Sequence, residues 1–187
     1  MGMFEPGESS AYVGLGSNLG DRTESCRRAV RMLDETSGCR VRSVSSLYLT
    51  EPVGVAGHDW YLNAVTEVRT ALRPLVLLRT LLALEAEIGR VRAAKLEPRV
   101  IDLDLLLYGR VVAEGPELIL PHPRMHARRF VMVPLAEIAP GLVHPVLGLT
   151  VREMLDSCPS EGQVISLWPS GNPGWHGVAG ACECSYD

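Results

Sequence analysis

The run RVIDLDLLLY, residues 99–108, is almost wholly apolar apart from its first residue and two aspartates, Asp102 and Asp104. Such a run predicts a buried strand, and because strand side chains alternate in direction, both aspartates must project from the same face. Two adjacent carboxylates on a mostly buried sheet repel each other and lose hydration. A divalent cation removes both costs, and oxygen ligands suit Mg²⁺. From these residues alone, a metal site and a pair of exposed or salt-bridged acids both remain open.

Composition is that of an ordinary globular protein: 187 residues, 47% apolar and 21% charged. The length predicts one domain over residues 11–168, with a flexible tail over residues 1–10 and a disordered tail over residues 169–187. A net charge of −4 gives no general case for nucleic acid or an anionic membrane as a partner. Residues 90–129, however, hold eight basic and five acidic residues, so positive charge gathers around the aspartates.

The cysteines are five in number, which is odd, and their spacing does not indicate a disulfide framework. The first ten residues lack the basic and apolar pattern of a signal peptide, and no run is long enough to span a membrane. We therefore expect a cytoplasmic protein with free thiols.

Helical and strand patterns are mixed along the chain, and several strands are joined by short turns. Strands are predicted over residues 11–15, 41–49, 60–70, 99–108, 111–113, 117–120 and 164–167. Helices are predicted from a D-x-x-E capping box at Asp21, from Pro74 to about Ile88, over residues 133–138, and from a second capping box at Thr150 to about Cys158. This mixture favours an α+β sandwich with a mainly antiparallel sheet.

Arginines bracket the loop before the aspartate strand, with Arg90 and Arg92 at its start and Arg99 at its end. Their guanidinium groups could clamp a triphosphate and neutralise developing charge. A helix dipole would also favour Arg90, although it would not explain Arg99. Glu85 falls on the leucine-rich side of its helix, which indicates either an arginine partner or a nearby site.

Two further segments carry polar groups in constrained places. His122 stands between two prolines and is followed six residues later by Arg128, which fits a placed pair of donors or a structural turn. Tyr61 and Asn63 share a strand face, where they could stack on and hydrogen-bond a flat heterocycle or simply pack across strands. The pattern Gly14-x-Gly16 after a strand is a weak dinucleotide hint without its acidic partner, and no P-loop motif is present.

Taken in order, six blocks resemble the 6-hydroxymethyl-7,8-dihydropterin pyrophosphokinases of folate biosynthesis. The blocks are Gly14-Leu15-Gly16-Ser17-Asn18-Leu19-Gly20, Ser45-Ser46-Leu47-Tyr48-x-Thr50, Tyr61-Leu62-Asn63-Ala64, Glu85-x-x-x-Gly89-Arg90-Val91-Arg92, Pro98-Arg99-x-x-Asp102-Leu103-Asp104 and Pro121-His122-Pro123-Arg124-Met125-x-x-Arg128-x-Phe130. The resemblance covers residues 11–155. It implies a ferredoxin-like α+β fold and an enzyme that transfers the pyrophosphoryl group of MgATP to the hydroxymethyl oxygen of the pterin, with release of AMP.

The resemblance also implies roles for individual residues. Asp102 and Asp104 would hold two Mg²⁺ ions, and together with Arg90 and Arg99 would form the catalytic set. ATP would be bound by Glu85, Arg90, Arg92, Arg99, Leu105, His122 and Arg128, with Leu105 touching the adenine. The pterin would stack between Tyr61 and Phe130, with Thr50, Pro52, Val53 and Asn63 around its edge. The expected partners are these two substrates, without nucleic acid or membrane, and the expected state is a monomer.

The chain departs from the family pattern in two places. Leu96-Glu97 stands before Pro98-Arg99, where the family commonly has Trp-Gly, and Glu51 stands where proline is common. Two other functions remain as alternatives. One is a non-catalytic ATP- or metabolite-binding module on the same fold, and the other is a D-x-D sugar-nucleotide transferase, for which the chain is short and too antiparallel.

Overall fold

The computed structural model of the chain describes residues 7–52, 59–90, 98–160 and 164–169. Its strands and helices follow one another as β1 (Ser9–Ser17), α1 (Arg22–Glu35), β2 (Cys39–Val44), β3 (Tyr48–Thr50), β4 (Tyr61–Thr70), α2 (Pro74–Ile88), β5 (Asp102–Tyr108), β6 (Ala113–Glu114), β7 (Ile119–Leu120), the 3₁₀ turn η1 (Met125–Ala127), α3 (Arg129–Ile138), α4 (Val151–Ser157) and β8 (Ile165–Leu167). The predicted α+β class is thus confirmed. Within the described ranges, no helix is long and apolar enough to cross a bilayer.

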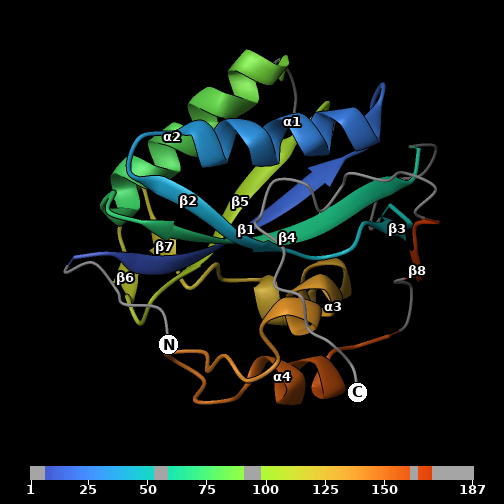
Figure 1. Cartoon of the computed structure of the whole chain (residues 1–187). Helices are drawn as coiled ribbons and strands as arrows, with labels where there is room; N and C mark the ends of the chain where they lie inside the picture. The colour runs from blue at the N-terminus through green and yellow to red at the C-terminus, as the bar shows by residue number, and fades with distance from the viewer. Residues whose placement is uncertain (1–6, 53–58, 91–97, 161–163, 170–187) are drawn as a thin grey trace, which may run out of the picture.

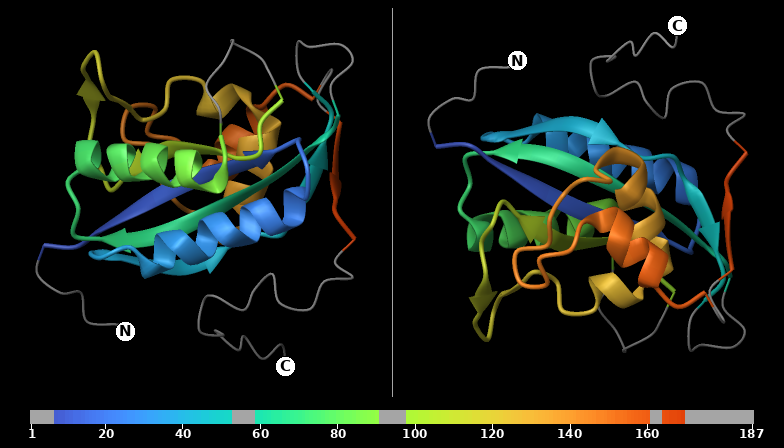
Figure 2. Two further views of the ribbon diagram at one scale, coloured as in Figure 1. Left: turned by 90° about the horizontal axis from the view of Figure 1, so that it is seen from above. Right: turned by 90° about the horizontal axis from the view of Figure 1, so that it is seen from below.

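The main sheet is antiparallel throughout, in the order β5-β1-β4-β3-β8, with β2 also paired to β4. Helices α1 and α2 cover one face, and α3 and α4 cover part of the other (Figures 1 and 2). Each face carries its own apolar layer. Leu15, Leu62 and Leu103 belong to the layer on the α1 and α2 side, while Val65 and Leu106 pack with the residues of α3 and α4.

The helix ends follow the sequence signals closely. The Asp21 carboxylate accepts a hydrogen bond of 3.0 Å from the Glu24 N–H at the start of α1. Helix α2 begins at Pro74 and ends at Gly89, whose φ of 118° is a left-handed conformation that favours glycine. The predicted capping box at Thr150 is complete in α4.

The strand predicted over residues 41–49 is instead divided into β2 and β3. Val44 pairs with Thr66 and Tyr48 pairs with Asn63, so the chain between them holds one residue more than its partner strand. Ser45 causes this interruption, because its hydroxyl accepts the Val65 N–H at 3.0 Å in place of a backbone carbonyl.

Helix α3 is longer than the turn predicted over residues 133–138, because it begins at Arg129 and continues through Pro134. Proline forfeits one backbone hydrogen bond, and burial of Val131, Met132 and Leu135 offsets that cost. Near its end, the Glu137 carboxylate accepts hydrogen bonds from the Ser46 N–H and the Tyr48 hydroxyl, at 2.9 and 2.8 Å. These bonds tie the helix to β3.

Strand β1 begins two residues before the predicted start, and the other short strands are displaced by one or two residues. Cys26, Cys39 and Cys158 are free and buried, as expected for reduced thiols. Residues 170–187 of the tail predicted over residues 169–187 lie outside the described residues.

Candidate functional site

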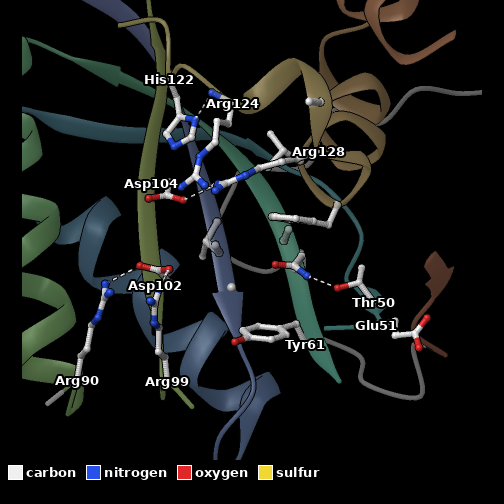
Figure 3. Close-up of a pocket in the computed structure, with 18 residues that line it drawn as sticks. Thr50, Glu51, Tyr61, Arg90, Arg99, Asp102, Asp104, His122, Arg124 and Arg128 are labelled. Carbon is white, nitrogen blue, oxygen red and sulfur yellow. Dashed lines mark hydrogen bonds and ion pairs between the residues drawn. The ribbon is translucent and has the colours of Figure 1, made fainter. Parts of the chain in front are cut away.

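A pocket of about 490 Å³ opens on the α3 side of the sheet, beyond the area that α3 and α4 cover (Figure 3). Strand β5 supplies its acidic side, β1 its floor and β4 with β3 its opposite side. The residues that line it are Gly14, Leu15, Gly16, Thr50, Glu51, Tyr61, Asn63, Ala64, Arg90, Arg99, Asp102, Asp104, His122, Arg124, Ala127, Arg128, Phe130 and Val131. Segments from both halves of the chain therefore meet there.

Two glycines make the floor of this pocket. Gly14 pairs with Asp104 on one side of β1 and with Val65 on the other, while Gly16 pairs with Asp102 and Asn63. A Cβ on Gly16 would lie 3.0 Å from the Asn63 Oδ1 atom, closer than such contacts normally come. The missing side chains thus keep an open trough between the aspartates and the amide.

Asp102 and Asp104 point from the same face of β5 into the pocket, as the alternation of strand side chains predicts (Figure 3). The Asp102 carboxylate pairs with two guanidinium groups: Arg90 Nη1 lies 2.5 Å from its Oδ1 atom, and Arg99 Nη1 contacts its Oδ2 atom. Burial lowers the pKa of Arg90, but the Asp102 and Glu85 carboxylates raise it above the ordinary value. Arg90 therefore remains a cation at the pocket edge.

Glu85 lies behind Arg90 and does not itself line the pocket. Its side chain is 1% exposed, pairs with the Arg90 guanidinium and accepts the Leu103 N–H at 2.7 Å. Burial raises the pKa of Glu85, against the Leu103 N–H and the Arg90 guanidinium, which lower it. Through these two contacts, Glu85 holds the Arg90 guanidinium and the backbone of β5 in place.

Two arginines and a histidine surround Asp104. Arg128 Nη1 lies 3.7 Å from the Asp104 Oδ2 atom, and Figure 3 shows His122, Arg124 and Arg128 converging there. Burial, followed by repulsion from Arg124, lowers the pKa of Arg128. For Asp104, burial and the neighbouring Asp102 carboxylate raise the pKa. The Arg124 side chain makes no hydrogen bond or ion pair with any residue that the structure describes.

His122 is held as a neutral ring with a defined tautomer. Its Nδ1 atom accepts the Arg124 N–H at 3.3 Å, which leaves the proton on Nε2. Burial lowers the pKa of His122, and the two nearby guanidinium groups lower it further against the pull of Asp104. At neutral pH this residue is therefore a hydrogen-bond donor rather than a cation.

The far side of the pocket has aromatic and amide groups. The Asn63 Nδ2 atom donates to the Thr50 hydroxyl at 2.7 Å, and Tyr61 stands opposite Thr50 on the neighbouring strand. Phe130 comes from the start of α3, where the Arg128 guanidinium lies 5.5 Å from its ring centroid. These groups form a polar and aromatic recess, which we call the slot, across the glycine floor from the aspartates.

The donors near the aspartates fit a hard cation. In the described parts of the chain, no cluster of three or more histidine, cysteine, aspartate or glutamate side chains could enclose a metal ion. Two carboxylates with surrounding guanidinium groups instead suit Mg²⁺, which binds through one or two carboxylates, water and the phosphates of a substrate. Asp102 and Asp104 would hold it.

Not every predicted residue lies at the pocket. Arg92 and Val53 lie outside the described residues, and Pro52 is described but does not line the cavity. Alternation along β5 turns the Leu105 side chain to the opposite face, where it is 5% exposed within the layer beneath α1 and α2 and does not line the pocket. Contact between Leu105 and the adenine stays a prediction.

Sequence reasoning missed several pocket residues. Gly14 and Gly16 give a weak dinucleotide hint and belong to the first block of the family resemblance, although alternate glycines on a strand also indicate a close approach to the backbone. Arg124 belongs to a block that resembles the family, and the resemblance implies no role for it. Glu51 differs from the residue common in the family, and the sequence alone does not place it at a site.

Comparisons with known proteins agree on one family. The sequence profile described as "7,8-dihydro-6-hydroxymethylpterin-pyrophosphokinase (HPPK)" matches residues 12–140. The chain is 48% identical over 145 residues to a Methylorubrum extorquens protein named "2-amino-4-hydroxy-6-hydroxymethyldihydropteridine pyrophosphokinase", with 78% of this chain and 90% of that protein covered. A Bacillus subtilis protein of the same name is 46% identical over 128 residues, with 68% of this chain and 77% of that protein covered.

A solved structure, "Crystal structure of Plasmodium falciparum HPPK-DHPS wild type", has a similar fold, with a TM-score of 0.64 at 14% identity. The likeness covers 80% of this chain and 44% of that longer chain, so this chain spans less than half of it. At this identity the likeness concerns the fold, and it confirms the predicted ferredoxin-like α+β architecture.

Proposed function

We propose that the pocket described above is where this member of the 7,8-dihydro-6-hydroxymethylpterin-pyrophosphokinase family binds both of its substrates. The chain belongs to that family and transfers the pyrophosphoryl group of ATP to the hydroxymethyl group of the pterin in folate biosynthesis. The observation that carries this assignment is the layout of the pocket. Paired carboxylates among guanidinium groups face an aromatic and amide slot across a floor without side chains. A sensor of ATP alone would not need that slot, and nothing in the comparisons supports a non-catalytic module.

The triphosphate of ATP occupies the cationic side of the pocket. Arg90 and Arg99 approach from one side of the aspartates, and Arg128, His122 and Arg124 approach from the other (Figure 3). Guanidinium groups suit this work because they bind phosphate oxygens with paired N–H donors. Arg92 remains a proposed ATP ligand, whereas Glu85 acts through Arg90.

Two Mg²⁺ ions are proposed at Asp102 and Asp104. When bound, they neutralise phosphate oxygens and so reduce the repulsion that a nucleophile meets at phosphorus. The same carboxylates contact Arg90, Arg99 and Arg128 in this structure. Those arginines would consequently be released toward the phosphates when the carboxylates take the metal.

The pterin lies in the slot, between Tyr61 and Phe130, with Thr50 and Asn63 at its edge. The Asn63 amide is well prepared for a heterocycle, because its hydrogen bond to Thr50 fixes its orientation. Pro52 and Val53 would complete this edge. The slot faces Asp102 and Asp104 across Gly14 and Gly16, so the hydroxymethyl group can point to the phosphates.

Transfer then requires positioning and charge neutralisation rather than a covalent protein nucleophile. The hydroxymethyl oxygen forms a bond to the β-phosphorus, while the bond from that phosphorus to the oxygen bridging the α-phosphate breaks. AMP leaves with the bridging oxygen, and the proton of the hydroxyl group passes to solvent. Arg90 and Arg99 steady the charge that develops, and the test is formation of AMP when the chain is incubated with MgATP and the hydroxymethyl pterin.

The state and location of the protein follow as further inferences. We propose that the protein is a monomer. Free buried thiols at Cys26, Cys39 and Cys158 fit a reducing compartment such as the cytoplasm. Neither substrate requires nucleic acid or a membrane. We also propose residues 11–168 as the single domain.

Replacing Asn63 with alanine is expected to raise KM for the pterin about tenfold and to leave ATP binding unchanged. The substitution removes one amide that would otherwise pair with the heterocycle, a loss of about 1–1.5 kcal/mol. Steady-state kinetics with each substrate varied in turn would measure the effect. An unchanged pterin KM would place the pterin elsewhere.

Replacing Arg124 with glutamine should have the opposite selectivity, with KM for ATP raised about tenfold and KM for the pterin unchanged. A charge-assisted hydrogen bond contributes about 1.5 kcal/mol or more, and Arg124 has no partner to lose among the described residues. The matched control is Arg152→Gln, because Arg152 is exposed on α4, away from the pocket. If Arg124→Gln and Arg152→Gln had the same KM for ATP, Arg124 would not be a phosphate ligand.

A further inference from the structure

The segment that follows β1 is joined to the residue that ends the arginine loop. The Asn18 side chain is 2% exposed, and its Oδ1 atom accepts the Arg99 N–H at 2.6 Å. In return, the Asn18 N–H donates to the Arg99 carbonyl oxygen at 3.0 Å. The two residues are 81 positions apart, so this is a closed pair of hydrogen bonds between distant parts of the chain.

This pair holds Arg99 at the place where its side chain is used. Gly16, two residues before Asn18, pairs with Asp102, and the Arg99 guanidinium contacts the Asp102 carboxylate. The backbone of Arg99 is thus fixed at the end of β1 while its side chain enters the pocket. No other residue in the described ranges accepts the Arg99 N–H.

We propose that Asn18 is a positioning residue that acts through Arg99 in pyrophosphoryl transfer. The inference rests on the proposed role of Arg99 at the phosphates. It explains why an asparagine follows the two glycines, since a side chain with a carbonyl oxygen at this position can accept a backbone N–H without adding a charge.

The neighbouring residue supplies a matched control. The Ser17 Oγ and Asn18 Nδ2 atoms are both buried without a hydrogen-bond partner among the described residues. A buried polar atom without a partner costs stability. Ser17 differs from Asn18 in having no side-chain bond to Arg99, so removal of its hydroxyl should leave transfer intact.

The test is a double-mutant cycle on AMP formation at saturating substrates, with Asn18→Ala, Arg99→Ala and the double variant, and with Ser17→Ala beside them. We expect kcat to fall about tenfold or more in Asn18→Ala and to stay within about twofold of wild type in Ser17→Ala. If Asn18 acts only through Arg99, the double variant should be no slower than Arg99→Ala alone. A loss of general stability would not produce this coupling.

Four outcomes would overturn the inference. The first is an unchanged kcat in Asn18→Ala, and the second is a double variant whose losses multiply. The third concerns Asn18→Asp, which keeps an oxygen that can accept the Arg99 N–H and should retain most of the wild-type kcat even if the alanine variant does not fold. A fall in the kcat of Asn18→Asp as deep as that of Arg99→Ala contradicts the proposal. If Arg99→Ala itself keeps wild-type turnover, the proposed role of Arg99 is wrong and this inference fails with it.

Discussion

Asp104→Asn is expected to lower the rate of AMP formation by about a thousandfold or more without weakening the fold. Asparagine keeps the shape of the side chain but removes the negative charge that would bind Mg²⁺ next to the phosphates. A metal ion contributes several kcal/mol of stabilisation to the transition state, and about 1.4 kcal/mol corresponds to a tenfold change in rate. Activity should therefore fall steeply even at saturating magnesium.

The stability of this variant should move in the other direction. Burial and the Asp102 carboxylate raise the pKa of Asp104 in the folded protein. A carboxyl group whose pKa is raised on folding costs stability when ionised, and that cost disappears as the pH falls through the raised pKa. Asp104→Asn removes the cost at neutral pH, so its Tm should equal or exceed that of the wild type.

Two measurements check both expectations. Calorimetry of Mn²⁺ binding in the presence of a non-hydrolysable ATP analogue should show weaker metal binding, and thermal unfolding at pH 7 should give the Tm. A suitable control is Glu117→Gln, which should retain activity, because Glu117 forms an exposed ion pair with Arg79 and does not line the pocket. Near-normal turnover of Asp104→Asn would rule out the proposed metal site.

Local sequence patterns were sufficient to predict the acidic side of the site and much of the fold. Alternation along a strand has a period of two residues, so Asp102 and Asp104 had to share a face wherever that strand lay in the sheet. Helix α2 likewise begins at Pro74 and ends before Gly89 because both residues act through their own backbone angles. Such features depend on neighbours in the sequence, which is why they were predictable.

Other features depend on residues that meet only after folding. Ser45 divides a predicted strand because its hydroxyl meets the Val65 N–H, twenty positions away. Asn18 gains its partner, Arg99, from 81 positions away. Neither contact has a local periodicity that a sequence pattern could reveal. The same holds for Arg124, which reaches the pocket because η1 places it beside His122 and Arg128.

Leu105 shows what strand alternation decides and what it leaves open. The resemblance implies contact between this residue and adenine, and the alternation that places both aspartates in the pocket turns the Leu105 side chain to the other face. The local pattern therefore predicts where this side chain lies, while the adenine contact of Leu105 stays a prediction.

Gly16→Ala is expected to raise KM for the pterin about tenfold or more, whereas Gly14→Ala should have a much smaller effect. Both glycines lie on β1 and face the pocket, but an added Cβ meets different surroundings at each. At Gly16 it would lie 3.0 Å from the Asn63 Oδ1 atom and would push the amide out of place. At Gly14 its nearest neighbour is a Leu106 methyl carbon at 3.5 Å, which is an ordinary contact.

Neither substitution should damage the strand, since alanine has a smaller conformational-entropy cost than glycine. The effect must then come from the pocket, where a displaced Asn63 amide would lose a hydrogen bond to the pterin worth about 1–1.5 kcal/mol. Titration with the pterin in the presence of an ATP analogue would compare the two variants directly. If Gly16→Ala bound the pterin as well as Gly14→Ala, the floor beneath Asn63 would not limit the slot. The proposed pterin position would then be wrong, although the assignment of Asp102 and Asp104 to the metal would stand.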